Sequence, residues 1–410
     1  MLASQASILV LMQWYTMNSM APASRNRMTS PGCGSEGKGA TGMDMGSSRL
    51  LSWSLVLATL IVLAQAAPPS RARAQHAAYN AVVLPGDARM HPDAQTEWWY
   101  YTGHLHDATG HTFGFELVTF KLQGLKKAFP LSPINTAYRI DFAITDEAAQ
   151  TFHDVVSYVV PNPPKTVMST SSLSIRAATA GTSVAVDTLP GPDLAYRVRG
   201  SMSAGAVDLM VGTARRPLLE GGQGVVSMGS GGHSYYYSLT NLRTTGTLTL
   251  AGHAYAVTGT TWMDHQWGNW RWDKIRGWDW MGVQLDNGTS VVLSNFNGSR
   301  LVAKSADVSF ANSTQLVTTK SQMTPSGPSW TSPGTGAQYP QGWHIVVPDI
   351  GLDAQVTPVM ANQEVVEPLG LGATNWEGSC LVSGTLRGKP VAGRAYTELV
   401  GYAKPSMLGI

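Results

Sequence analysis

One carboxylate and one imidazole stand side by side in a part of the sequence that is crowded with tryptophan. They are Asp264 and His265, and the stretch from Trp262 to Trp280 holds six of the 13 Trp of the chain. Indole rings lower the local dielectric, and a carboxyl group in such surroundings tends to stay protonated. A protonated carboxyl could act as an acid toward an apolar substrate. The same surroundings suit a buried structural aspartate, so both interpretations stay open.

The alternation of side chains along a strand decides which residues accompany this carboxylate. If residues 260–266 form a strand, Trp262, Asp264 and Gln266 share one face, whereas Met263, His265 and Trp267 share the other. The acid would then work beside an indole that stabilises a carbocation. His265 is a second catalytic candidate, but on this parity it need not form a dyad with Asp264. In the structural interpretation, His265 only orients its neighbour, and Asp264 caps a turn or pairs with Arg139 or Arg276.

The other aromatic residues are predicted to line a ligand cavity, to fill the core, or to do both. The candidates for ligand binding are Trp98, Trp99, Tyr235, Tyr237, Trp262, Trp267, Trp270, Trp278 and Trp280. Gln266, Tyr235 or Tyr237 could hold the water molecule that a hydration consumes. Such a reaction requires no cofactor.

No metal site is predicted. His104 and His106 would point to one face of a strand, but a third ligand is not identifiable. Ser234 lacks the Gly-x-Ser-x-Gly elbow of serine hydrolases. Glu116, Glu377 and Glu398 lie among apolar strand residues and are interpreted as structural carboxylates. Glu377 is also a minor candidate acid.

The elements that must position these residues are short strands. Glu97–Leu105 is rich in aromatic strand formers, and a turn at residues 107–110 leads into the alternating run Thr112–Phe120, as in a hairpin. Similar runs follow at Tyr138–Thr145, Leu194–Val198, Val207–Val211, Tyr235–Leu239, Gly246–Leu250, Tyr255–Thr261, Trp278–Leu285, Ser290–Phe296, Trp343–Val347 and Tyr396–Tyr402. Because turn residues recur at sandwich or barrel spacing and no long amphipathic helix is found, the sequence predicts an all-β protein.

Composition supports this class and excludes one kind of partner. Charged residues make up only 13% of the 410 residues, and there are 43 Gly and 23 Pro. The formal net charge is +2 without a basic run, so nucleic-acid binding is not expected. The two cysteines, Cys33 and Cys380, have no metal or redox spacing.

Residues 43–75 are predicted to be a signal peptide. Arg49 supplies the positive charge, Leu50–Leu63 supplies the apolar core, and two Ala-x-Ala sites follow. The alternative is a membrane anchor, if the apolar run extends to Ala67. Residues 1–42 lack periodicity and are predicted to be an untranslated or disordered extension. We therefore expect a periplasmic or extracellular protein.

A faint internal repeat divides the rest of the chain. Trp98–Phe115 and Trp278–Leu293 each combine two aromatic residues, a leucine, a glycine turn and alternating apolar residues. Two hairpins of one design suggest two related β domains, predicted at 76–260 and 261–410. Asp264 would lie where the domains meet, which is a preferred place for a ligand pocket.

Several of these segments, in their order along residues 85–403, resemble the AttH/CrtC-like family. The motifs are His91-Pro92 with Glu97–Gly103, Phe142–Asp146, Ser234–Ser238, Gly259 with Trp262–Gly268, Gly277–Trp280 and Trp376–Gly378. The resemblance implies two packed, lipocalin-like antiparallel β-barrels. The best-known activity of the family is carotenoid 1,2-hydratase (hydroxyneurosporene synthase), and its proposed acid, in the Trp-x-Asp-His motif, falls on Asp264.

The export signal fits the exported branch of that family. We therefore expect a protein that binds an elongated apolar ligand, an isoprenoid or a lipid, and that hydrates an isolated C=C bond by acid catalysis without a cofactor. The alternatives are a non-catalytic lipid or pigment carrier, a secreted hydrolase-like protein, and a purely structural protein. Contact with a membrane surface is a further expectation, and the sequence does not indicate the oligomeric state.

Overall fold

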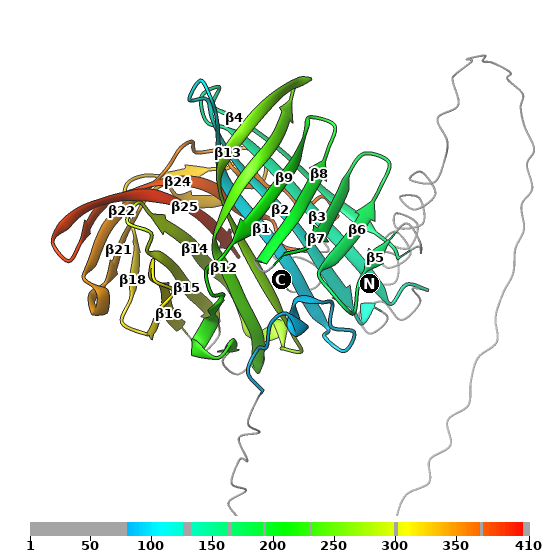
Figure 1. Cartoon of the computed structure of the whole chain (residues 1–410), viewed down its shortest axis with the longest axis horizontal. Coiled ribbons are helices and arrows are strands. Elements are labelled where there is room, and N and C mark those ends of the chain that lie inside the picture. The colour runs from blue at the N-terminus through cyan, green and yellow to red at the C-terminus, as the bar shows by residue number, and fades with distance from the viewer. Residues whose placement is uncertain are drawn as a thin grey trace, which may run out of the picture. The chain divides into compact units, whose positions relative to one another are not determined.

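The described residues consist of β-strands and short 3-10 helices, which confirms the all-β prediction (Figure 1). The computed structural model describes residues 80–125, 133–161, 166–191, 194–228, 231–298, 302–369 and 372–404, so the predicted signal peptide and the extension before it lie outside it. The 3-10 helices are η1 (Gly86–Ala88), η2 (Glu220–Gly222), η4 (Trp272–Lys274) and η5 (Pro348–Ile350). Within this part of the chain, no helix is long and apolar enough to cross a membrane.

Sheet A contains thirteen strands of the described residues, all paired antiparallel, and it curls strongly into a half-barrel (Figure 1). Its order is β4 (Thr151–Val159), β3 (Thr136–Asp146), β2 (Thr112–Gln123), β1 (Thr96–Asp107), β13 (His253–Gly268), β12 (His233–Leu250), β9 (Gly205–Thr213), β8 (Leu194–Ser201), β7 (Ser183–Thr188), β6 (Ser174–Ala178) and β5 (Val167–Met168). Two short strands, β10 (Leu218–Leu219) and β11 (Val225–Ser227), also pair with β12.

Sheet B has ten strands in the same part of the chain and curls in the same way. Its order is β17 (Gln315–Thr318), β16 (Val302–Ser309), β15 (Ser290–Gly298), β14 (Ile275–Leu285), β25 (Lys389–Val400), β24 (Asn375–Leu386), β22 (Leu352–Pro358), β21 (Trp343–Val347) and β18 (Gln322–Pro325), with β23 (Glu364–Val365) on β24. A separate pair is formed by β19 (Ser329–Thr331) and β20 (Gln338–Pro340).

The two sheets share one plan. Each places its first strand between its second strand and its last: β1 lies between β2 and β13, and β14 lies between β15 and β25. Both first hairpins turn on a glycine with positive φ, Gly110 at 86° and Gly288 at 81°, a conformation that other residues adopt with strain. Strand β13, which crosses the predicted domain boundary at 260/261, belongs wholly to sheet A, and sheet B begins at β14. The division into two domains stays a prediction.

Hydrophobic side chains form one core inside each sheet and a third cluster between the sheets. Strand β1 is buried along most of its length because one face packs inside sheet A and the other packs against sheet B. The cluster between the sheets comprises Tyr100, Val118, Leu218, Trp262, Trp280, Val292 and Tyr396, with Trp98, Phe120 and Trp278 packed against it. The outer faces of the two half-barrels therefore form an interior of their own.

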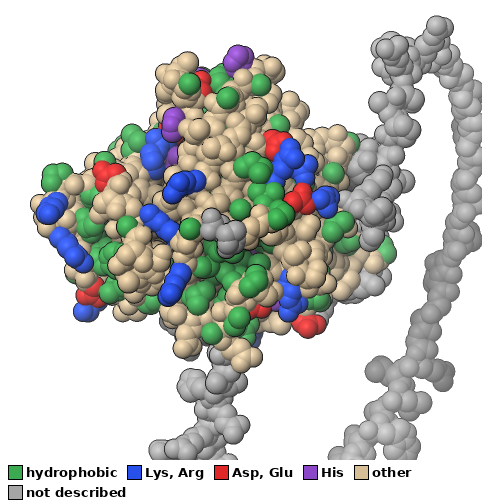
Figure 2. Space-filling model, in the orientation of Figure 1, with side chains coloured by type: hydrophobic (Ala, Val, Ile, Leu, Met, Phe, Trp, Pro, Cys, Tyr) green, Lys and Arg blue, Asp and Glu red, His purple; other side chains and the backbone are tan. Residues whose placement is uncertain are grey.

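The surface carries little charge. On the face drawn in Figure 2, Lys and Arg side chains are scattered, and hydrophobic side chains gather near the centre. Most of the remaining surface on this face consists of backbone and uncharged polar side chains, as the low proportion of charged residues leads one to expect.

Candidate functional site

Asp264 lies on the face of sheet A that packs against sheet B. In the pairing of β1 with β13, Asp264 is opposite Tyr100, and its neighbours on the same face, Trp262 and Gln266, are opposite Thr102 and Trp98. The predicted alternation is confirmed, because Met263 and Trp267 belong to the core inside sheet A. Asp264 therefore faces the interior formed between the two sheets.

Three neutral groups surround the Asp264 carboxyl group. Trp262 Nε1 donates to Oδ1 at 2.6 Å, and the Tyr236 hydroxyl donates to Oδ2. Ser238, the register partner of Asp264 on β12, also forms a hydrogen bond with it. Tyr236 is held in turn by sheet B, since Trp280 Nε1 donates to its hydroxyl oxygen at 3.0 Å.

A glycine on sheet B makes room for this arrangement. A Cβ atom at Gly282 would lie 2.6 Å from the ring of Trp280 and 3.2 Å from that of Trp262. With glycine there, the two indoles meet edge to face with ring centroids 5.9 Å apart. The indole that donates to Asp264 is therefore packed against the indole that donates to Tyr236.

None of the described residues supplies a cation that neutralises Asp264. Arg139, one of its predicted partners, pairs with Asp141 at 2.6 Å, and in the described part of the chain no Lys or Arg forms an ion pair with Asp264. Burial raises the pKa of Asp264 and its hydrogen bonds with Ser238, Tyr236 and Trp262 lower it, leaving it at about 6. This carboxyl therefore changes its protonation state close to neutral pH.

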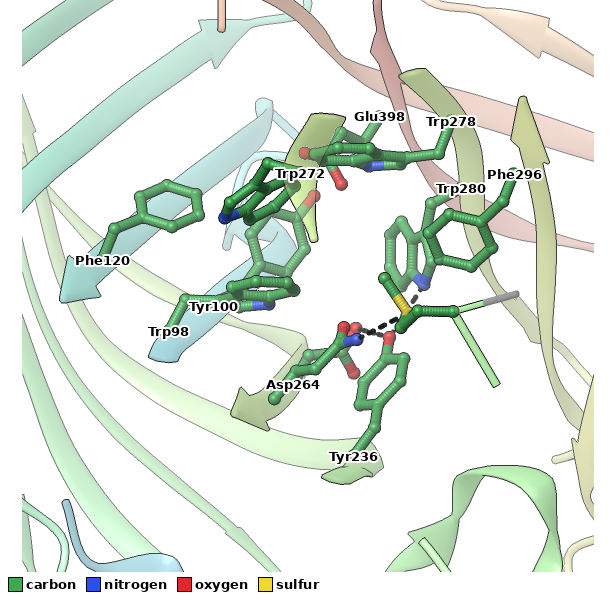
Figure 3. Close-up of a pocket in the computed structure, with 12 residues that line it drawn as sticks. Trp98, Tyr100, Phe120, Tyr236, Asp264, Trp272, Trp278, Trp280, Phe296 and Glu398 are labelled. Carbon is green, nitrogen blue, oxygen red and sulfur yellow. Dashed lines mark hydrogen bonds between the residues drawn. The ribbon is translucent and has the colours of Figure 1, made fainter. Parts of the chain in front are cut away.

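The carboxyl group opens onto an aromatic cavity between the sheets (Figure 3). The lining residues are Trp98, Tyr100, Phe120, Met228, Tyr236, Asp264, Gln266, Trp272, Trp278, Trp280, Phe296 and Glu398. The volume in which the centre of a water molecule fits is about 40 Å³, enough for a few waters. Trp272 comes from η4, the segment between the sheets, and its Nε1 donates a 3.1 Å hydrogen bond to Thr96 Oγ1.

Glu398 is the second carboxyl group of this cavity. It lies on β25, next to Trp272 and Trp278 and away from Asp264 in the view of Figure 3. Burial raises its pKa, a hydrogen bond from Trp278 lowers it, and the charge of Asp264 raises it again, to about 7. Two carboxyl groups that titrate near neutrality therefore line one apolar space, which is the pattern of an acid and base pair.

A neighbouring cavity continues the first. Both are lined by Trp98, Phe120, Trp272, Trp278 and Glu398. The second cavity is also lined by polar side chains from both sheets, Arg139 and Asn375. An aromatic passage therefore runs from Asp264 past Glu398 toward a more polar end.

His265 points the other way, into sheet A. Its Nε2 lies 2.9 Å from Glu97 Oε1, and its ring stacks on Trp99 with centroids 4.9 Å apart. Burial lowers the pKa of His265, so the ring is neutral. Burial raises the pKa of Glu97, but hydrogen bonds from His265 and His91 outweigh it and leave that pKa lowered. His265 is thus the neutral partner of a buried carboxylate, and it does not contact Asp264 through its side chain in this network.

Among the described residues, His91, Glu97 and His265 form a group that could hold a metal ion, since their ligand atoms lie within 4.8 Å of one another. Two imidazoles and a carboxylate are a donor set that zinc accepts. Here, however, Glu97 Oε1 already bonds both rings, at 2.8 and 2.9 Å, and the buried ammonium of Lys121 lies 3.7 Å from Oε2. Because Lys121 supplies the compensating charge, we assign the three residues to a hydrogen-bonded network that supports the strand ends.

The predicted ligand-binding residues fall into three groups. Trp98, Trp278 and Trp280 line the cavity, and Trp262 lies directly behind Asp264. Trp270 packs edge-on against Trp98, with centroids 5.5 Å apart. The third group lies on the opposite face. Trp99, Tyr237 and Trp267 belong to the core inside sheet A, and Tyr235 stacks on Trp267. A role for them as direct ligand contacts stays a prediction.

Sequence reasoning did not single out Tyr236, Tyr100, Phe120 or Trp272. The signal for Tyr236 lies in the run Ser234–Ser238, where the middle tyrosine shares its parity with the two serines. Ser238 is the register partner of Asp264, so Tyr236 and Ser234 must lie on the same face. That register is a long-range property, and alternation alone leaves the choice between the two faces open.

The fold and the site together define a class: a protein of two curled antiparallel sheets with a protonatable carboxyl group in an aromatic cavity between them. Residues 75–402 match the AttH-like family, and the chain belongs to that family. A solved AttH-type protein from Nitrosomonas europaea is 25% identical, with a TM-score of 0.68 over 79% of this chain and 98% of that one.

Two further relatives carry names that describe a reaction. Kievitone hydratase from Nectria haematococca is 18% identical, with a TM-score of 0.62 over 78% of this chain and 93% of that one, and this likeness concerns the fold. The dehydratase asqC of Emericella nidulans is 24% identical over 215 residues, which are 50% of this chain and 60% of that protein. The chain thus spans about three fifths of the length of that dehydratase.

Proposed function

We propose that this protein binds an apolar ligand between its two sheets and adds water to, or removes water from, an isolated C=C bond, with Asp264 as the acid. The observation that carries the proposal is the environment of Asp264, a carboxyl group with a pKa of about 6 at the wall of an aromatic cavity. The hydratase and the dehydratase among its relatives support the same type of chemistry.

The chemical step needs an acid, a base and a cation site. In the hydration direction, the Asp264 O–H bond breaks and its proton joins one alkene carbon with the π electron pair. The other carbon becomes a cation, a water oxygen bonds to it, and the proton released from that water passes to the Glu398 carboxylate. The reverse sequence removes water. Indole faces of the cavity stabilise the cation by up to about 2 kcal/mol.

The donors around Asp264 suit this role because they stabilise the carboxylate that remains after proton transfer. Tyr236 and Trp262 each donate to one of its two oxygens. Burial favours the protonated form, so the two effects together place the pKa near the working pH of a general acid. Neither donor carries a charge that would repel the cation.

The cavity indicates the class of ligand. Its wall is aromatic, and it continues past Trp272 and Trp278 into the second cavity, so an elongated molecule would run through both. Because the space is narrow, we propose that these two half-buried indoles swing aside to admit the ligand. An isoprenoid or lipid chain fits this shape and polarity. Export of the protein, proposed on residues 43–75, would place this activity outside the cytoplasm.

The experiment compares Asp264→Asn with the wild type and with a matched control. Squalene, an acyclic isoprenoid with isolated double bonds, serves as the first probe, in water labelled with ¹⁸O. Asp279→Asn is the control, because Asp279 is a largely buried carboxyl group on β14 that bonds Tyr402 at 2.9 Å and does not line the cavity.

The proposal expects labelled product from the wild type and from the control, and binding without product from Asp264→Asn. A non-catalytic carrier would bind the probe equally in all three proteins and would form no product in any. Identifying the apolar compounds that co-purify with the wild type extends the test to other chain lengths.

A further inference from the structure

We propose that Glu220 and Asp307 form a buried proton reservoir that recharges Asp264 through the hydroxyl group of Ser238. The hydrogen-bonded chain is a structural inference, and its catalytic use rests on the proposed function. It links the cavity wall with η2, which lies on the side of β12 away from β13, where residues 221–223 are exposed to solvent.

The reservoir is a pair of carboxyl groups that share a proton. Glu220 in η2 and Asp307 in β16 are each 2% exposed, and their side chains are hydrogen-bonded to one another. Two carboxyl groups can form such a bond only if one of them is protonated. The backbone N–H of Gly221 donates to Asp307 Oδ1 at 2.9 Å, so Asp307 is held as the acceptor and Glu220 keeps the proton.

The surroundings of the pair favour retention of this proton. Burial raises the pKa of Glu220, and the charges of Asp307 and Asp264 raise it further. Tyr236 is the other titratable group that interacts with Glu220. In the described part of the chain, no Lys, Arg or His forms an ion pair with Glu220 or Asp307. A proton shared by the two carboxyl groups therefore takes the place of a cation in reducing their negative charge.

Ser238 connects the pair to Asp264. It is fully buried, its Oγ donates to Glu220 Oε1 at 2.9 Å, and it also bonds Asp264, its register partner. A hydroxyl group has one proton but two acceptor lone pairs, so it can donate to only one of the two carboxyl groups at a time. The other carboxyl group must then donate to it. Ser238 donates to Glu220 before a proton transfer and to Asp264 after it, or the reverse, so the two hydrogen-bond arrangements are the start and the end states of that transfer.

The transfer balances without a further reactant. When Asp264 has given its proton to the ligand, it is a carboxylate and accepts the Ser238 hydroxyl. The proton that Glu220 shares with Asp307 then shifts to Glu220 Oε1, the oxygen that faces Ser238, and passes to Ser238 Oγ while the proton of Ser238 moves to Asp264. Asp264 is recharged, and Glu220 and Asp307 are now both carboxylates. The pair regains a proton from solvent.

The position of the pair explains why such a route is useful. An apolar ligand in the aromatic cavity excludes water from the front of Asp264. Behind it, residues 221–223 are exposed, and a surface recess of about 850 Å³ is lined by Leu219, the neighbour of Glu220, and by Gln315. The proposed route for solvent protons therefore enters from this side and does not pass the ligand.

The test measures how fast Asp264 exchanges its proton. The full-length protein is labelled with ¹³C at the aspartate carboxyl groups, the Asp264 band is identified by its loss in Asp264→Asn, and its infrared signal is followed after a pH jump across pH 6. Ser238→Ala should slow the change of this band by about tenfold or more, which corresponds to a barrier about 1.4 kcal/mol higher. Glu220→Gln should slow it as well.

Two variants separate the relay from a general disturbance of the strand. Ser238→Thr keeps the hydroxyl group and should keep the fast rate. Ser234→Ala removes another fully buried hydroxyl on the same strand and face, one that bonds Gln266 at 2.7 Å, and should leave the rate unchanged. Equal rates in the wild type, Ser238→Ala and Glu220→Gln would overturn the relay. Since this measurement uses no substrate, it is independent of whether Asp264→Asn loses product.

Discussion

The hydroxyl group of Tyr236 should control the pKa of Asp264, and Tyr236→Phe removes that group without changing the ring. A buried hydrogen bond to a charged group contributes about 1.5 to 3 kcal/mol, and 1.36 kcal/mol corresponds to one pH unit, so the loss should raise the pKa of Asp264 from about 6 to about 7 or 8. The variant should also be less stable by about 1 to 3 kcal/mol, because Trp280 Nε1 loses the acceptor that it bonds at 3.0 Å.

Carbon-13 NMR of labelled aspartate, with Asp264→Asn to assign the signal, measures this pKa directly, and urea unfolding measures the stability. Tyr237→Phe is the matched control, since Tyr237 is fully buried on the same strand, faces the core of sheet A, and its hydroxyl has no hydrogen-bond partner in the described residues. The control should leave the pKa of Asp264 at about 6. A pKa that stays the same or falls in Tyr236→Phe would refute the view that this hydroxyl stabilises the carboxylate.

Three further predictions follow from the carboxyl groups. The pKa of Asp264, about 6, lies above its ordinary value of 3.8. The contribution of Asp264 to stability is therefore present below pH 3.8 and is lost as the pH rises through 6, a change of about 3 kcal/mol in the free energy of unfolding. Asp264→Asn should remove this pH-dependent change from urea-unfolding measurements made across that range. Hydration should be fastest between about pH 6 and pH 7, where Asp264 and Glu398 together hold one proton, and a rate that only rises with pH would contradict their roles. The pKa of Glu97 is lowered from 4.5, so its contribution to stability is present above pH 4.5 and is lost on acidification. Glu97→Gln should lower the free energy of unfolding by about 3 kcal/mol at neutral pH, measured by urea unfolding. A loss that does not shrink in acid would show that the charge of Glu97 is unimportant.

Local periodicity was sufficient for part of the site. Asp264 and Trp262 lie two residues apart on one strand, so their common face follows from the alternation of side chains, and the same rule sends His265 to the other face. The all-β class followed from equally local signals, namely short alternating runs and glycine turns.

The rest of the site depends on pairing between distant strands, which alternation does not reveal. Tyr236 joins Asp264 because of the register of β12 on β13, and Glu398, interpreted from the sequence as structural, reaches the cavity from the last strand of sheet B. The predicted strands Tyr235–Leu239 and Gly246–Leu250 form one strand, β12, with a register shift between Leu239 and Leu242. The carbonyl of Thr240, within this shift, accepts a 2.8 Å hydrogen bond from Gln284 of sheet B, so the irregularity is stabilised by a partner far away in sequence.

The place of β1 between β2 and β13 has a consequence for the time course of synthesis. Asp107 pairs with Val257 and Thr96 pairs with Gly268, so the partners are separated by 150 to 172 residues. At a translation rate of about 5 to 20 residues per second, the nascent hairpin waits about 8 to 34 s before the second neighbour of β1 leaves the ribosome. During that interval β1 exposes unpaired backbone groups beside Trp98, Trp99, Tyr100 and Tyr101, a strand edge that other chains can join. A newly made chain would therefore need protection at this edge long before the cavity exists.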